Sequence, residues 1–180
     1  MTTFDLTHTS EPWVVLVPED TVEVRRQLSE LTAKGGRVHH FDARDLVTEQ
    51  GLYRSFADIL RFPGYFGRNW DAMVDCLDDL CGEVTGGVGI VGVIHDADRL
   101  LETAYFPLFV SVLCQGADRA NSAMDLDGDP LDRPAIAEHF VFEFSEFDRR
   151  RISARVEQPD LTVTTDDGFV GVGLNPDEWH

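Results

Sequence analysis

The first half of the chain alternates short apolar runs with apolar positions repeated at helical spacing. The run "WVVLV" at 13–17 predicts a buried strand, and "RVHHFDA" at 37–43 predicts a second one. Between them, apolar residues recur at helical spacing and stop at a pair of glycines: Val24, Leu28, Leu31, then Gly35 and Gly36. A strand, a crossover helix and a strand predict parallel pairing with a right-handed connection.

The second half continues this alternation. Residues 52–62 predict a helix that Pro63 ends, and "GGVGIVGVI" at 86–94 predicts a strand buried on both faces. Three more segments are expected: a helical region at 96–124 divided near Pro107, a strand at 139–144, and a hairpin at 161–173 turning at Asp167 and Gly168. The pattern predicts an α/β fold, a parallel sheet of about four strands flanked by helices, with an N-terminal β-α unit and a C-terminal hairpin.

One predicted helix, within "FPGYFGRNWDAMVDCLDDL" at 62–80, is unusually acidic. Asn69 is placed to cap it, which puts Asp71 near the positive end of the helix dipole. An apolar stripe follows helical spacing (Trp70, Val74, Leu77, Cys81), and an acidic stripe runs beside it (Asp71, Asp75, then Asp78 or Asp79). We expect the apolar stripe to be buried and the acidic stripe to be exposed.

The acidic stripe needs an explanation, because like charges four residues apart destabilise a helix and no basic residue lies between Asp71 and Cys81. The simplest interpretation is a solvated face. The preceding loop, however, carries aromatic residues between glycines (Gly64, Tyr65, Phe66, Gly67). An aromatic anchor beside an acidic ridge is typical of an interface to a cationic groove.

Composition narrows the choice of partner. The 180 residues, 43% of them apolar, are enough for one full core, and 33 acidic against 15 basic residues give a net charge of -18. Nucleic acid and anionic membranes would be repelled, so we expect neither as a direct partner. The charge suits a basic partner, although it also serves solubility.

Motifs for catalysis or metal binding are weak. The three cysteines, Cys76, Cys81 and Cys114, lack ligand spacing and are expected to be reduced, and the N-terminus lacks a signal-peptide pattern, so a cytoplasmic protein is expected. "DLDGDPLD" at 125–132 lacks the Gly and Glu of a calcium loop, and neighbouring His39 and His40 would point to opposite faces of a strand. We expect no metal ion and no cofactor.

The acidic helix and its loop resemble the barstar family of ribonuclease inhibitors. The resemblance is carried without a gap by Pro63, Tyr65, Phe66, Gly67, Asn69, Asp71, Ala72, Asp75, Cys76 and Leu77. It extends over about 37–144 by the order of elements. Accordingly we divide the chain into a polar tail at 1–12, a barstar-like domain at 13–147 and a C-terminal extension at 148–180.

The resemblance implies a bacterial immunity protein that blocks the active site of a basic secreted ribonuclease, or of a ribonuclease-type toxin domain. It implies Asp75 as the principal carboxylate, with Asp71 pairing with cations beside it and Tyr65 packing near the enzyme's catalytic histidine. The residues expected to contact the partner are Tyr65, Gly67, Asn69, Asp71, Val74, Asp75, Asp78 and Asp79. No catalytic residue is expected in this chain.

Three positions depart from the family pattern. Val74 replaces a tryptophan, Arg68 replaces an acidic residue, and either Gln115 or Asp118 lies near the position of a glutamate on a later helix. Two alternatives therefore stay open. One is an interaction module that kept the fold without ribonuclease binding. The other is a Mg²⁺-dependent phosphoryl-transfer enzyme using the four aspartates, although one helix face offers poor octahedral geometry.

Overall fold

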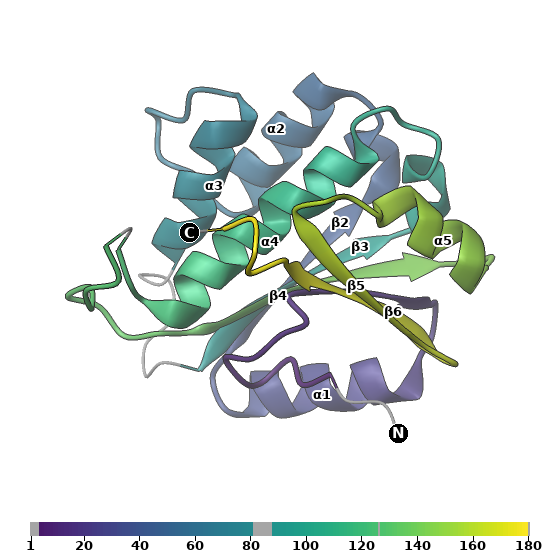
Figure 1. Cartoon of the computed structure of the whole chain (residues 1–180), viewed down its shortest axis with the longest axis horizontal. Coiled ribbons are helices and arrows are strands. Elements are labelled where there is room, and N and C mark those ends of the chain that lie inside the picture. The colour runs from purple at the N-terminus through teal and green to yellow at the C-terminus, as the bar shows by residue number, and fades with distance from the viewer. Residues whose placement is uncertain (1–3, 81–87, 126, 180) are drawn as a thin grey trace.

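The computed structural model describes residues 4–80, 88–125 and 127–179. Within these residues, six strands form one sheet in the order β2-β3-β4-β1-β6-β5. The first four positions pair in parallel, whereas β6 pairs antiparallel with both β1 and β5 (Figure 1). The strands are β1 (Val14–Pro18), β2 (Arg37–Asp42), β3 (Gly89–His95), β4 (Ala137–Phe144), β5 (Leu161–Asp166) and β6 (Phe169–Leu174).

Helices cover both faces of this sheet. Figure 1 shows α1 on one face, and α2, α3 and α4 stacked on the other. The helical elements are α1 (Val22–Ala33), η1 (Ala43–Leu46), α2 (Glu49–Ile59), α3 (Trp70–Asp78), η3 (Ala97–Leu100), α4 (Phe106–Ser122) and α5 (Arg149–Val156). The mixed α/β fold with a mostly parallel sheet confirms the fold class predicted from the sequence.

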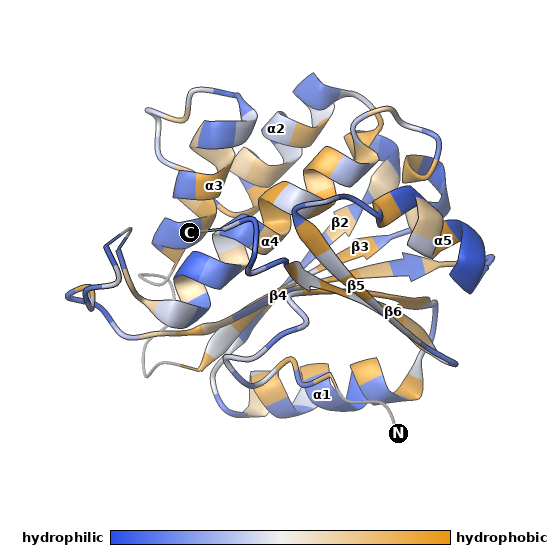
Figure 2. Cartoon of the chain, viewed as in Figure 1, coloured by the Kyte–Doolittle hydropathy of each residue, from blue (hydrophilic) through white to orange (hydrophobic). Residues whose placement is uncertain are grey.

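Side chains of β4 divide the core into two clusters. Phe140, Phe142 and Phe144 point to the cluster beneath α2, α3 and α4, whereas Val141 belongs to the cluster under α1. β3 is buried on both faces, as expected for a strand inside a parallel sheet. Figure 2 shows the resulting apolar colour along the central strands and the inner sides of the helices.

The structure differs from the sequence prediction at some helix ends. α2 begins at Glu49 rather than Leu52, because the Thr48 hydroxyl accepts a hydrogen bond from the Gly51 amide at 3.1 Å and caps the helix. Pro107 lies in the first turn of α4, where its missing amide hydrogen costs nothing. α5 was not predicted, because the helix begins with three arginines and has only two buried apolar residues, Ile152 and Val156, to show helical spacing.

Candidate partner-binding surface

The acidic helix α3 begins as its sequence predicts. The Asn69 side chain accepts a hydrogen bond from the Ala72 amide at 2.8 Å, and Asp71 lies in the first turn. Trp70 donates its indole hydrogen to Glu49 at 2.8 Å and packs against the rings of Tyr53 and Tyr105. These contacts fix the start of α3 against α2 and α4.

The buried side of α3 packs closely on α4. Met73, Val74 and Leu77 are buried, and α4 presents Gly116 to Leu77. A Cβ atom at Gly116 would lie 2.6 Å from the Leu77 Cβ, closer than carbon atoms can pack. The orientation of the acidic side of α3 therefore depends on a helix contact that has no room for an extra methyl group.

The opposite side of α3 exposes Asp71 and Asp75 to solvent, and Asp79, the C-cap of the helix, is exposed on the same side. These three carboxylates are spaced four residues apart, so they follow one line along the helix. Asp78 lies off this line and is half-buried. The structure therefore confirms an exposed acidic stripe on α3.

Two of the four aspartates have cationic neighbours that the sequence did not reveal. Asp75 pairs with Arg119 of α4 at 3.0 Å, and Asp78 pairs with Arg133. The expectation that the repulsion is uncompensated is therefore wrong for these two positions. Arg119 and Arg133 are far from α3 in the sequence, and no local motif marks them as its neighbours.

A buried carboxylic acid lies close to the Asp78–Arg133 pair. Glu138 of β4 is fully buried, and neither of its carboxyl oxygens has a hydrogen-bond partner among the described residues. Burial raises the pKa of Glu138 well above its usual value, and the Asp78 charge adds to this while Arg133 opposes it. Burial also raises the pKa of Asp78, against the lowering effect of Arg133 and Arg119.

The loop before α3 exposes one aromatic ring and holds another. Tyr65 is 75% exposed. Phe66 packs edge-on against Phe62 and Tyr53, and Arg68 has a left-handed backbone with φ of 51°. The Tyr65 side chain thus projects from the loop, and the packing of Phe66 anchors the loop beside it.

The other expected contact residues lie in different surroundings. Gly67 and Asn69 are exposed at the start of α3, whereas Val74 is only 4% exposed and packs in the core. Gln115 and Asp118 of α4 are half-buried and border a groove beside α3.

Burial and the carboxylates of Asp79 and Asp75 raise the pKa of the buried Cys76 thiol, so it is not activated as a nucleophile.

The cysteines, the acidic loop at 125–132 and the histidines were weaker candidates for a metal site. Cys76 and Cys114 are free thiols, and Cys81 lies outside the described residues. Asp125 accepts hydrogen bonds from the amides of Asp127 and Asp129, both at 2.9 Å. His40 contacts His95 at 2.8 Å. In the described ranges, no group of three or more potential ligands is arranged to hold a metal ion.

Comparison with known families bears on this surface. A family model described as Barstar (barnase inhibitor) matches residues 36–126, just over half of the chain. The match runs from β2 through α4 and includes the aromatic loop and α3, as the sequence resemblance predicted. Searches among curated proteins and among solved structures found no match. Among the described residues, no helix combines the length and the apolar character needed to cross a bilayer.

Proposed function

Because the chain belongs to the barstar family, we propose that it inhibits a basic secreted microbial ribonuclease by covering the active site with α3 and the loop before it. The observation that carries this proposal is the line of exposed carboxylates at Asp71, Asp75 and Asp79 beside the exposed ring of Tyr65. Carboxylates on a rigid helix can occupy the positions that substrate phosphates take among the cations of a ribonuclease.

In this proposal each surface residue takes the role that the family resemblance implies, adjusted to how exposed the residue is. Asp75 is the principal carboxylate, Asp71 and Asp79 flank it, and Tyr65 supplies an aromatic anchor. Gly67 and Asn69 present main chain at the rim. Val74 and Asp78 support the surface from below, since Val74 is in the core and Asp78 is engaged by Arg133. The net charge of -18 favours rapid encounter with a basic enzyme.

We also propose that the chain acts as an inhibitor in the cytoplasm and catalyses no reaction itself. The acidic stripe comes from one helix face, and Asp75 and Asp78 are paired with arginines, which compete with any metal ion. Purified protein should therefore not hydrolyse RNA, with or without Mg²⁺. A Mg²⁺-dependent rate that Asp75→Ala abolishes would support the phosphoryl-transfer alternative.

The test of inhibition is a titration of barnase, the ribonuclease that the family description names, against a fluorogenic RNA substrate. We expect activity to fall linearly to zero at an equimolar amount of inhibitor, as for tight one-to-one binding. Full ribonuclease activity in a large excess of folded protein would overturn the proposal. It would favour the non-inhibitory interaction module that Arg68 and Val74 left open.

A further inference from the structure

A groove lies beside the acidic helix, between α4 and the C-terminal residues of the chain. Its volume is about 570 Å³. Its walls combine aromatic and aliphatic side chains with three carboxylates. The lining includes Asp78, Asp118, Arg119, Met124, Leu131 and Trp179. Asp78 belongs to α3 and Arg119 pairs with Asp75, so the groove is continuous with the proposed inhibitory surface.

The C-terminal residues hold Trp179 in a fixed place at this groove. The Trp179 indole donates to the Asp160 carbonyl oxygen at 3.0 Å, and the Asn175 amide donates to the same carbonyl oxygen at 2.9 Å. The Asp160 carboxylate in turn accepts from Ser111 of α4 at 2.6 Å. Trp179 nevertheless stays 41% exposed. An aromatic side chain that is both held and exposed loses little entropy when a partner covers it.

Charge within the groove is not balanced. Arg119 directs its guanidinium to Asp75, and Asp78 is paired with Arg133. Asp118 is half-buried and forms no ion pair among the described residues. Burial raises its pKa, against the lowering effects of a hydrogen bond from Trp13 and of the Arg119 charge. Asp177 and Glu178 add negative charge on the tail. A half-buried carboxylate next to an exposed indole and the apolar side chains of Met124 and Leu131 suits a long cationic side chain.

We propose that this groove is a second docking surface for the ribonuclease, and that it takes an arginine or lysine side chain from the basic enzyme. The aliphatic stem lies along Leu131 and Met124, and the charged head lies between the Trp179 ring and Asp118. This inference rests on the proposed inhibitory function. It extends the partner surface from Tyr65, across α3, to a tail that lies outside the family match at 36–126.

The groove would mainly determine which ribonuclease the protein binds. The aromatic loop and α3 contact the enzyme's active site, whereas the groove binds a cationic side chain at the edge of that site. A ribonuclease without a basic residue at that edge would leave the Asp118 carboxylate desolvated without a cationic partner, which weakens binding. Trp179 and Asp118 are therefore specificity-determining residues in this proposal.

The experiment measures barnase binding by biolayer interferometry for the wild type and two groove variants, Trp179→Ala and Asp118→Asn. Each should raise Kd by about tenfold, chiefly through faster dissociation, because close contacts at an interface govern the dissociation rate. Trp179→Phe should recover part of the affinity, since it keeps an aromatic face. Thermal melts establish that each variant is folded.

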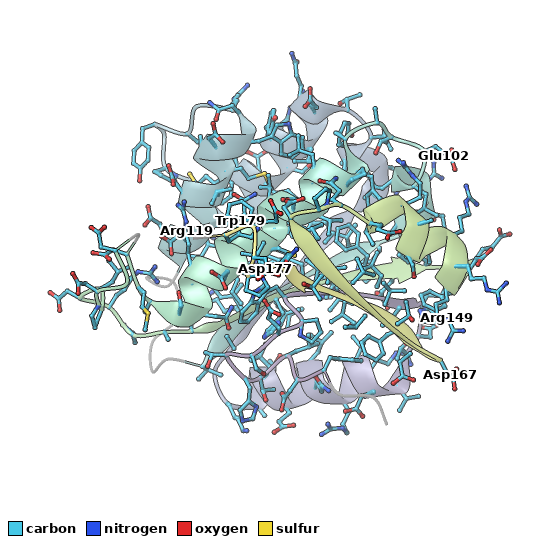
Figure 3. All side chains as sticks on the ribbon, in the orientation of Figure 1. Glu102, Arg119, Arg149, Asp167, Asp177 and Trp179 are labelled. Carbon is cyan, nitrogen blue, oxygen red and sulfur yellow. The ribbon has the colours of Figure 1, made fainter. Side chains whose placement is uncertain are left out.

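Matched controls separate the groove from general effects. Asp167→Asn removes the same charge at the far end of the molecule from Trp179 (Figure 3). Leu108→Ala removes an apolar side chain that is equally exposed, at 42%, on the first turn of α4. Both controls should stay within about twofold of the wild type, as expected for positions outside an interface.

The outcomes distinguish the two proposals. If the wild type binds and Asp75→Ala binds poorly, but the groove variants match their controls, the second docking surface is wrong and the inhibitory function stands. If Asp118→Asn and Asp167→Asn weaken binding equally, net charge explains the effect and the groove does not. A folded wild type that fails to bind at all overturns both.

Discussion

Asp75, the central carboxylate of the exposed stripe on α3, is held by Arg119 of the neighbouring helix at 3.0 Å. The Asp75 side chain is still 73% exposed, so the pair is accessible to water and salt. Exposed pairs of this kind contribute about 0 to 1 kcal/mol to stability. A partner's guanidinium can therefore replace Arg119 at little cost, and until then Arg119 keeps the carboxylate in a defined position.

Arg119→Gln should strengthen ribonuclease inhibition several-fold, because Asp75 then meets the enzyme's cations without an internal competitor. The loss of one positive charge should also speed association at low salt. The free energy of unfolding should change by less than about 1 kcal/mol. Association and dissociation rates of the barnase complex, measured at low and high salt, test this expectation. Weaker inhibition would mean that Arg119 itself contacts the enzyme.

Asp75→Ala should weaken inhibition by about 2 to 5 kcal/mol, because it leaves cations of the enzyme buried without a partner. Asp79→Ala, one turn further along α3, should cost much less and serves as the matched control. Thermal melts of the two variants should lie close to the wild type, since both carboxylates are exposed. Equal inhibition by wild type and Asp75→Ala, or a large loss of stability, would show that Asp75 has a structural role.

Gly116→Ala tests whether α3 must sit close to α4. The new methyl group would meet Leu77 and should destabilise the protein by about 1 to 3 kcal/mol through overpacking. It should also weaken inhibition, because α3 must shift although no surface residue has changed. Gly168→Ala, at the turn between β5 and β6, is the control: no atom of the described residues lies within 4 Å of its added Cβ. Denaturant unfolding and ribonuclease titration of both variants provide the comparison.

Glu138→Gln should make stability less dependent on pH. In the folded protein burial raises the pKa of Glu138 above its ordinary value of 4.5, so the folded state holds a proton that the unfolded state releases. The free energy of unfolding therefore falls as pH rises from 4.5 through the raised pKa, and this slope should disappear in the variant. The gain in stability from Glu138→Gln should be larger at about pH 8 than at about pH 5.

Urea unfolding at the two pH values measures this difference. Glu146→Gln, at an exposed position, controls for the loss of one surface charge. A stability difference between Glu138→Gln and wild type that stays constant with pH would contradict the expectation.

The sequence predicted correctly those features that depend on residues close together in the chain. Asn69 as the cap of α3, burial of Val74 and Leu77, and the hairpin turn at Asp167 all follow from short-range spacing and were correct. The ion pairs of Asp75 and Asp78 were not predictable, because they depend on how α4 and the segment before β4 pass over α3. The place of Trp179 beside α4 was not predicted for the same reason: only the folded chain brings the C-terminal residues to this helix.

The position of β1 in the sheet has a consequence for folding. Val14 pairs with Phe140 of β4 on one side and with Val172 of β6 on the other. The first strand therefore lies between two strands from the last third of the chain, and neither of its edges can be satisfied by a nearby segment. Such distant pairings are slow to form. We expect the aromatic loop and α3 to assemble with α2 and α4 while β1 still awaits β6, whose arrival closes the sheet.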